Sequence, residues 1–182
     1  MIEKVIMAGF GGQGVMLIGQ LLTYAGMYEG KEVSWLPSYG PEMRGGTANC
    51  HVTVSEKPIA SPIITKATSS IIMNNPSLTK FEGSIVAGGD LYINSTLVDM
   101  EPTRTDIHAF RIAASEIAEK AGSPRSANMV MLGAYLGRHP VVLLETVESV
   151  LRKTMTGSKE KYVSSNMDAI RAGIEISALL PK

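Results

Sequence analysis

The chain has 182 residues, of which 45% are hydrophobic, so it is the size of one domain and can bury a single core. Its 17 basic residues balance 17 acidic residues, which argues against nucleic acid or an anionic membrane surface as the main partner. No apolar run approaches the roughly 18–20 residues that a membrane-spanning helix needs.

The start of the chain and its cysteine content indicate the compartment. The first residues lead directly into an apolar run, without the basic segment of a secretory signal. Cys50 is the only cysteine, so no internal disulfide can form, and we expect a cytoplasmic protein. An iron–sulfur cluster needs several thiolate ligands, so a chain with one cysteine cannot hold such a cluster alone. The three histidines, His51, His108 and His139, lack the spacing of a helical metal site, so we expect no metal centre on this chain.

The first third of the chain predicts a strand, a helix and a second strand. Residues 5–8 form a short apolar run that ends at a glycine, which is typical of a buried strand. Residues 12–29 keep near-helical apolar spacing, and residues 32–36 predict a strand that ends at Pro37. This β-α-β order predicts parallel strands joined by a right-handed crossover.

The rest of the chain predicts more strands and then helices. Further strands are expected at residues 49–54, 70–73, 84–87 and 107–109. A turn at residues 88–90 should lead into a short edge strand at residues 91–93. Helical spacing is found at residues 111–121, 128–136, 144–155 and 166–179. We therefore predict that residues 1–182 form a single α/β, Rossmann-like domain with a mostly parallel sheet and a helical C-terminal portion.

A glycine motif, Gly9-Phe10-Gly11-Gly12-Gln13-Gly14, stands between the first strand and helix. It fits the pattern G-x-G-x-x-G, whose glycines allow a tight turn, close approach of a phosphate and close packing of the helix. Free N–H groups at the helix start favour an anion. The motif predicts either a phosphate contact or a tight turn that binds nothing.

An NAD site is not favoured, because the second strand runs into Leu36 and Pro37 without the acidic residue that would hold the ribose. The patterns of a nucleotide triphosphatase and of a hydrolase nucleophile are also absent from the sequence.

A second motif is Pro37-Ser38-Tyr39-Gly40-Pro41-Glu42-Met43-Arg44-Gly45-Gly46. Its prolines and glycines restrict the backbone to few conformations. Ser38, Tyr39, Glu42 and Arg44 are its candidate contact residues, and the arginine offers a planar fork suited to a carboxylate. The segment predicts a loop that docks on another subunit, or a rigid surface loop braced by its own glutamate and arginine.

The two motifs together resemble the paired signatures of the gamma subunit of 2-oxoacid:ferredoxin oxidoreductases of the 2-oxoglutarate or branched-chain type. Their order and spacing match, and so does the chain length. Ser126-Ala127-Asn128, at the start of a predicted helix, is also similar. The resemblance covers essentially the whole chain, and the longer second motif is its more specific part.

The resemblance implies a larger enzyme, which decarboxylates a 2-oxoacid oxidatively to an acyl-CoA and CO2. Thiamine diphosphate and iron–sulfur clusters are then expected on thiamine-bearing and ferredoxin-like partner chains. The gamma subunit is architectural, has no catalytic residue of its own, and helps to seat coenzyme A on the glycine motif and Asn128. The side chain of Asn128 could instead cap its helix or pack in the core.

Two questions stay open at the level of sequence. We favour 2-oxoglutarate as the substrate, with branched-chain 2-oxoacids as the other choice, and the electron acceptor is not indicated. A stand-alone nucleotide or coenzyme A binding protein is the alternative function. A large apolar surface patch outside any pocket would favour the subunit.

Overall fold

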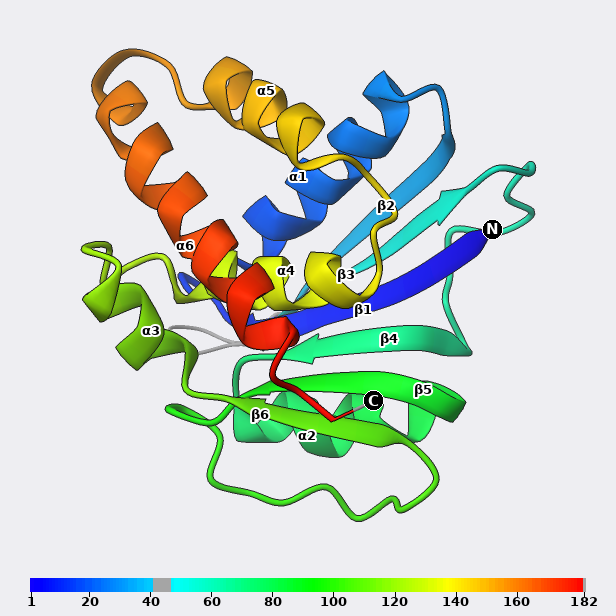
Figure 1. The fold of residues 1–182 in the computed structure, drawn as a ribbon. Coiled ribbons are helices and arrows are strands. Elements are labelled where there is room, and N and C mark those ends of the chain that lie inside the picture. Colours follow the sequence, from blue (N-terminus) through cyan, green and yellow to red (C-terminus); the bar gives the residue numbers. More distant parts are fainter. Residues whose placement is uncertain (41–46, 182) are drawn as a thin grey trace.

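A six-stranded sheet forms the centre of the computed structural model, which describes residues 1–40 and 47–181 (Figure 1). The strands are β1 (Ile2–Phe10), β2 (Glu32–Tyr39), β3 (Thr47–Ser55), β4 (Ala67–Ile72), β5 (Ile85–Asn94) and β6 (His108–Ile112). The helices are α1 (Val15–Tyr28), α2 (Asn75–Phe81), α3 (Ala114–Lys120), α4 (Ala127–Arg138), α5 (Leu144–Thr154) and α6 (Val163–Ser177), with two short 3-10 helices, η1 (Glu82–Ser84) and η2 (Gly157–Tyr162). Within the described ranges, no helix is long and apolar enough to span a bilayer.

The strand order is β2-β3-β1-β4-β5-β6. β1, β4, β5 and β6 pair in parallel, whereas β3 is antiparallel to both β1 and β2. Five of the six strands therefore run in one direction, which confirms the α/β class with a mostly parallel sheet. The first two strands are parallel as expected, but they are not neighbours, because β3 lies between them.

Three boundaries differ from the sequence predictions. β2 continues through Pro37 to Tyr39, which an edge strand permits because one side of its backbone has no strand partner. Residues 85–93 do not form two strands around a turn: they belong to the single interior strand β5, which absorbs a left-handed Gly88 (φ 74°) through a register shift, and Ser84 ends η1. The helix expected from residue 111 begins only at Ala114, because β6 occupies residues 108–112.

α2 was not predicted from the sequence. Its start is fixed by Asn74, whose side chain accepts a hydrogen bond from the Ser77 backbone N–H at 2.8 Å, and by the proline in the first turn.

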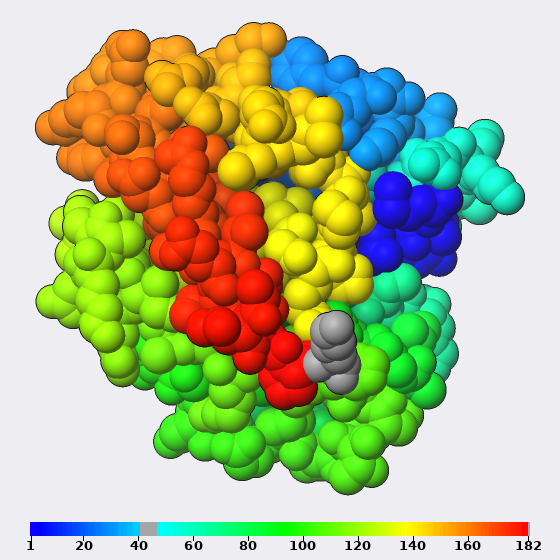
Figure 2. Space-filling view, in the orientation of Figure 1, coloured from blue at the N-terminus to red at the C-terminus, as the bar shows by residue number. Residues whose placement is uncertain are grey.

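The sheet separates two apolar clusters of unequal size. Alternate residues of β1 point to opposite faces: Val5 and Met7 pack under the layer of α1, α3, α4, α5 and α6, and Ile6 and Ala8 face α2. Figure 1 shows most of the helices above the sheet and α2 below it. In the space-filling view, α6 crosses the surface of the helical layer with α3 beside it (Figure 2).

α4 and α6 touch through their backbones. A side chain at Gly133 of α4 would overlap the carbonyl oxygen of Ile170, and one at Gly173 of α6 would overlap that of Val130. Ser126, at the start of α4, contacts Asn166 near the start of α6, and Gly137, near the end of α4, lies against Ser177 at the end of α6. The two helices therefore run roughly parallel, and their N-terminal ends lie on the same side. Glycine at these positions allows an approach that larger residues prevent.

This contact gives a stability prediction. We expect Gly133→Ala to lower the free energy of unfolding by about 2 kcal/mol or more, because the new methyl group meets backbone atoms that no rotamer change can move. Urea unfolding of both variants measures the effect. The control is Gly83→Ala, at an exposed position with no atom within 4 Å of the added carbon, and it should change stability little. Equal stability of the two variants would contradict this account of the contact.

Candidate functional site

A cavity of about 880 Å³ opens at the carboxyl edge of the parallel strands, where α1 follows β1. This is the edge at which open α/β sheets bind ligands. Three segments supply its walls, residues 12–17, 122–129 and 155–166. The volume lies in the range of about 300–1,000 Å³ that is typical of small-molecule sites.

The glycine motif forms the first wall in a tightly held turn. Gly12 (φ 90°) and Gly14 (φ 76°) are left-handed, a conformation that favours glycine. The Gln13 side chain accepts a hydrogen bond from the Phe10 N–H at 2.6 Å and donates one to the Met73 carbonyl at 3.0 Å. The amide of Gln13 is thus used to close the turn and to tie it to the end of β4.

Asn128 fixes the glycine turn against α4. Its Nδ2 donates to the Gly14 carbonyl at 3.2 Å, and an added carbon at Gly14 would overlap this amide group. The third glycine of the motif therefore permits close packing of α1 on α4, rather than on a strand. The asparagine lies in the first turn of α4 and does not cap it: Ser126 is the N-cap residue and makes no capping side-chain bond.

The cavity is electrostatically suited to an anion. α1, α4 and α6 all begin at its walls, and neither α1 nor α4 has a side-chain cap within the described residues. Uncapped helix starts present free N–H groups and the positive end of the helix dipole. Arg125 and Lys159 add two cations, and no acidic residue is among the described residues that line the cavity.

The second and third walls are joined by a polar chain. Ser126 Oγ donates to Asn166 Oδ1 at 2.5 Å and also contacts Ser123 Oγ at 2.5 Å, and Asn166 Nδ2 contacts the Met155 sulfur at 3.3 Å. Apolar surface comes from Leu17, Met129, Met155, Pro124 and the ring of Tyr162. The cavity can therefore hold a ligand that has both phosphate groups and apolar parts.

The structure brings together four of the predicted cofactor-binding residues. Gly12, Gln13, Gly14 and Asn128 all line the cavity. Gly11 is exposed beside them, and Gly9 lies within β1, packed against Met73 and Gln13. Sequence reasoning missed Arg125, Lys159 and Tyr162. Their position just before a helix start is the signal that could have indicated them.

The second motif is described only in part. Ser38 and Tyr39 end β2, and both are exposed, with Tyr39 69% accessible. Glu42 and Arg44 lie outside the described residues. β2 ends at the same edge of the sheet as the glycine motif, since Tyr39 pairs with Ala48 and Phe10 pairs with Thr47.

Cys50 lies on β3 and is fully buried between sheet and α1. Its thiol is 3.5 Å from the Val15 carbonyl oxygen, and burial raises the pKa of the thiol to about 12. A thiol in this state is neither a nucleophile nor a metal ligand at neutral pH.

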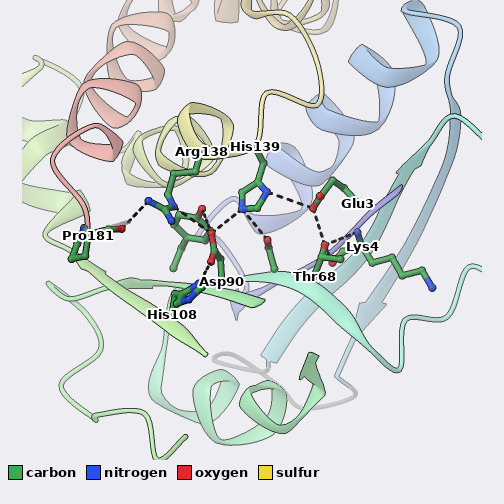
Figure 3. Close-up of polar contacts among 10 residues, drawn as sticks. Glu3, Lys4, Thr68, Asp90, His108, Arg138, His139 and Pro181 are labelled. Carbon is green, nitrogen blue, oxygen red and sulfur yellow. Dashed lines mark hydrogen bonds and ion pairs between the residues drawn. The ribbon is translucent and has the colours of Figure 1, made fainter. Parts of the chain in front are cut away.

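A charged cluster lies at the other end of the sheet, away from the carboxyl ends of the parallel strands and beside the C-terminal end of α4 (Figure 3). His139 Nε2 lies 2.9 Å from Asp90 Oδ2, and its Nδ1 lies 3.7 Å from Glu3 Oε2. Asp90 is also 2.9 Å from His108 and 3.3 Å from Arg138, which donates to the Pro181 carbonyl at 2.9 Å. These contacts join β1, β5, β6, α4 and the C-terminal segment.

The pKa values in this cluster are coupled. Burial alone would lower the pKa of His139, but its hydrogen bonds with Asp90 and Glu3 outweigh burial and raise the pKa to about 9. Burial would raise the pKa of Asp90, but hydrogen bonds from His139, His108 and Arg138 hold it well below its usual range. His139 is therefore charged at neutral pH and links two carboxylates. Because its hydrogen bonds are all internal to the fold, we interpret the cluster as structural.

Comparison with known proteins gives a family match over most of the chain. The model of the family described as "Pyruvate ferredoxin/flavodoxin oxidoreductase" matches residues 4–176. The ketoisovalerate oxidoreductase subunit VorA of Methanothermobacter thermautotrophicus is 37% identical over 173 residues, which are 94% of this chain but 36% of that protein. The 2-oxoglutarate synthase subunit KorC of Methanocaldococcus jannaschii is 32% identical over 179 residues, which are 96% of this chain and 94% of the relative. The chain thus spans about a third of the VorA relative and nearly all of KorC.

Solved structures show the same fold. The gamma subunit of a keto/oxoacid ferredoxin oxidoreductase from Geobacter sulfurreducens has a TM-score of 0.82 and 26% identity, and the match covers 97% of this chain and 99% of that one. A 2-oxoglutarate:ferredoxin oxidoreductase from Magnetococcus marinus, solved with 2-oxoglutarate, coenzyme A and succinyl-CoA bound, has a TM-score of 0.86 at 24% identity, over 100% of this chain and 32% of that one.

The raised pKa of His139 predicts how stability depends on pH. A histidine whose pKa is raised on folding stabilises the protein fully below its unfolded-state value, 6.5, and that contribution is lost as pH rises to about 9. We expect His139→Gln to lower the free energy of unfolding by about 2 kcal/mol near pH 6 and by much less near pH 9.5. Urea unfolding at both pH values measures this.

The control for this prediction is His108→Gln, which removes a half-exposed histidine from the same carboxylate. It should have a smaller effect near pH 6. A His139→Gln effect that does not change with pH would show that packing of the ring, which stacks on Tyr135 at 5.0 Å, matters more than its charge.

Proposed function

The chain belongs to the pyruvate ferredoxin/flavodoxin oxidoreductase family, and we propose that it is the gamma-type component of a 2-oxoacid:ferredoxin, or related acceptor, oxidoreductase. In this assembly the chain contributes the site for coenzyme A and does not itself carry out the oxidation. The observation that carries the proposal is the anion-attracting cavity at the glycine motif, in a chain that aligns with nearly the full length of a KorC relative.

The cavity is suited to coenzyme A by its chemistry. The pyrophosphate of coenzyme A matches the free N–H groups where α1 begins, beside Gly12 and Gly14. The apolar wall formed by Leu17, Met129 and Tyr162 matches the adenine ring and the pantetheine chain. The presence of coenzyme A in the similar Magnetococcus marinus enzyme is in keeping with this assignment.

The remaining chemistry belongs to partner subunits in this proposal. One cysteine cannot supply the thiolates of an iron–sulfur cluster, and Cys50 is buried with a raised pKa. We therefore assign thiamine diphosphate to a thiamine-bearing chain and the clusters to a ferredoxin-like chain. This chain binds coenzyme A and holds it in place for attack on the acyl group formed elsewhere.

Exposed apolar side chains support a subunit over the alternative, a stand-alone nucleotide or coenzyme A binding protein. Tyr24, Met27 and Tyr28 lie on one face of α1, and each is more than 40% exposed. Leu143 is 63% exposed beside them, since its backbone N–H donates to Glu29 at the end of α1. This group lies away from the cavity, as a partner surface would.

We propose that the second motif also contacts a partner, through Ser38, Tyr39, Glu42 and Arg44. The exposed Tyr39 ring at the cavity edge of the sheet supports this placement. We further propose that residues 1–182 form one domain, because a single sheet organises both apolar clusters. A cytoplasmic location stays a prediction from the sequence.

For the substrate we propose 2-oxoglutarate. The support is that KorC relatives align over nearly their whole length, whereas the VorA relative is about three times as long as the matched region. A branched-chain 2-oxoacid is the alternative that the assay below distinguishes.

We expect the chain to co-purify with partner subunits from its native host. The assembly should reduce a viologen dye with 2-oxoglutarate and coenzyme A, and should do so more slowly with branched-chain 2-oxoacids. The chain alone should be colourless and inactive, because the redox centres are on other subunits. Turnover by the isolated chain, or purification without any partner, would contradict the proposal.

Gly11 offers a test of the coenzyme A site. Because an added carbon there meets no atom within 4 Å and the residue is not left-handed, Gly11→Val should fold normally while filling space next to the phosphate. We expect at least tenfold weaker binding of coenzyme A to the assembled variant, measured by titration. The control Gly83→Val, also in open space, should bind normally. Normal binding by both variants would leave the glycine motif as a structural turn.

A further inference from the structure

β2 leaves one long side of the sheet open (Figure 1). It ends the strand order, so within residues 1–40 and 47–181 no strand pairs with its outer side. None of its 8 residues is fully buried, although Val33, Trp35 and Leu36 are apolar. Folded monomers usually protect such an edge with a short strand or with several charged side chains. β2 has a single charged residue, Glu32, at its first position, so the edge is suited to pairing with another strand.

The hydrogen-bond pattern shows which backbone groups of β2 face the open side. Gly40 donates to the Thr47 carbonyl at 3.0 Å, so these two residues form a hydrogen-bonded pair that continues the β2–β3 ladder. Bonded and non-bonded pairs alternate along an antiparallel ladder. The even-numbered residues of β2 therefore bond to β3, and the odd-numbered residues direct their N–H and C=O groups outward. Among these, Pro37 lacks an N–H, which leaves Val33 and Trp35 before it as consecutive positions where a second strand can exchange bonds.

The flank of α1 above this edge is also uncharged. Gly26 faces the sheet, and the buried Ile18 and Ala25 lie on the flank toward the other helices. With 3.6 residues per turn, Gln20 and the 48% exposed Met27 lie on the opposite flank, above the open side of β2. α1 has no charged residue, whereas the surface helices α5 and α6 each have several. The strand edge and the helix flank thus form one continuous uncharged side of the molecule.

From these features we propose that two copies of this chain associate through β2, antiparallel and about a twofold axis at Ser34. Val33 of each copy then exchanges both of its backbone hydrogen bonds with Trp35 of the other copy. The two side chains lie on the same face of the joined sheet, as a cross-strand pair of a β-branched and an aromatic residue, which stabilises strand pairing. The inference goes beyond the proposed function, because the pairing requires neither coenzyme A nor another subunit.

A second copy fits this edge because the strand is complementary to itself. With the axis at Ser34, Pro37 lies at the end of the new ladder, where its missing N–H removes no bond. Each Glu32 lies beside Leu36 of the other copy, so the two carboxylates are at opposite ends of the ladder and do not repel each other closely. The chain has a formal net charge of zero, so the copies have no strong overall repulsion either. Twofold dimers are the commonest homo-oligomers.

The proposed dimer keeps both candidate sites accessible. A twofold axis through an antiparallel strand pair is perpendicular to the sheet, so the carboxyl edges of the two sheets point in opposite directions. The cavity at the glycine motif lies at this edge, and so does the end of β2 with Tyr39. The two copies therefore present their cavities at opposite ends of the dimer, each open to its own partner chain.

The test places charges on the axis. The molar mass of the full chain is measured by light scattering over a concentration series, and the wild type should reach twice the 19.5 kDa of one copy. Ser34→Lys and Ser34→Asp should each remain monomeric, because two like charges would then face each other across the axis. An equimolar mixture of the two variants should regain the mass of a dimer, because opposite charges then meet. Ala109→Lys is the matched control: it adds an exposed charge to β6, the other edge strand, and should leave the dimer intact.

A second measurement needs no variant. Hydrogen exchange of the amides of Val33 and Trp35 should be slower at high than at low protein concentration, because only the dimer protects these outward N–H groups. Melting curves check that the Ser34 variants are folded. A wild type that stays monomeric, with exchange independent of concentration, overturns the proposal and leaves a strand of another subunit as the occupant of this edge. A dimer that survives both Ser34 substitutions, or a mixture that does not regain the dimer, overturns the pairing at β2.

Discussion

The backbone contact between α4 and α6 is the constraint on which the rest of the helical layer depends. Helices with ordinary side chains between them pack with axes about 8–10 Å apart. Here Gly133 and Gly173 remove the side chains that would set that distance, and each helix meets carbonyl groups of the other. The helices run roughly parallel, so the contact gathers two helix starts at one place. The polar chain from Ser126 to Asn166 closes the gap between them. A cavity wall thus exists because two glycines allow two backbones to touch.

α4 links two polar regions with opposite chemistry. Its N-terminal end carries Asn128 and faces a cavity with positive potential, and its C-terminal end carries Arg138 and the charged His139. The cations at the C-terminal end agree with the helix dipole, which favours them there. At the N-terminal end the cations of the cavity add to the positive end of the dipole, so this end favours a bound anion. The cluster at the C-terminal end satisfies its charges internally. The cations of the cavity have no acidic partner among the described residues, whereas the charges of the cluster are paired with one another. This difference distinguishes a candidate ligand site from a structural cluster.

The sequence predicted those parts of the fold that depend on local pattern. The glycine motif was placed correctly between β1 and α1, and Asn128 at the start of a helix, because turn residues and helical spacing act over short ranges. The position of β3 between β1 and β2 could not be predicted from the sequence, because strand pairing depends on residues far apart in the chain. The sequence predicts a strand end at Pro37, because it does not show which strand lies at an edge of the sheet and so tolerates a proline. Arg125 and Lys159 could not be found from the sequence, because they are far apart in the chain and become neighbours only when α4 packs on α6.

The position of β1 has a consequence for how the chain is made. β1 precedes the other five strands in the chain, yet it lies inside the sheet, and the strands on both its sides, β3 and β4, come later. Until residues 47–72 leave the ribosome, β1, whose second half is apolar, has two unpaired edges and no sheet to join. Open strand edges are sites of wrong association. During synthesis, β1 is therefore open to wrong association until both of its partner strands have emerged.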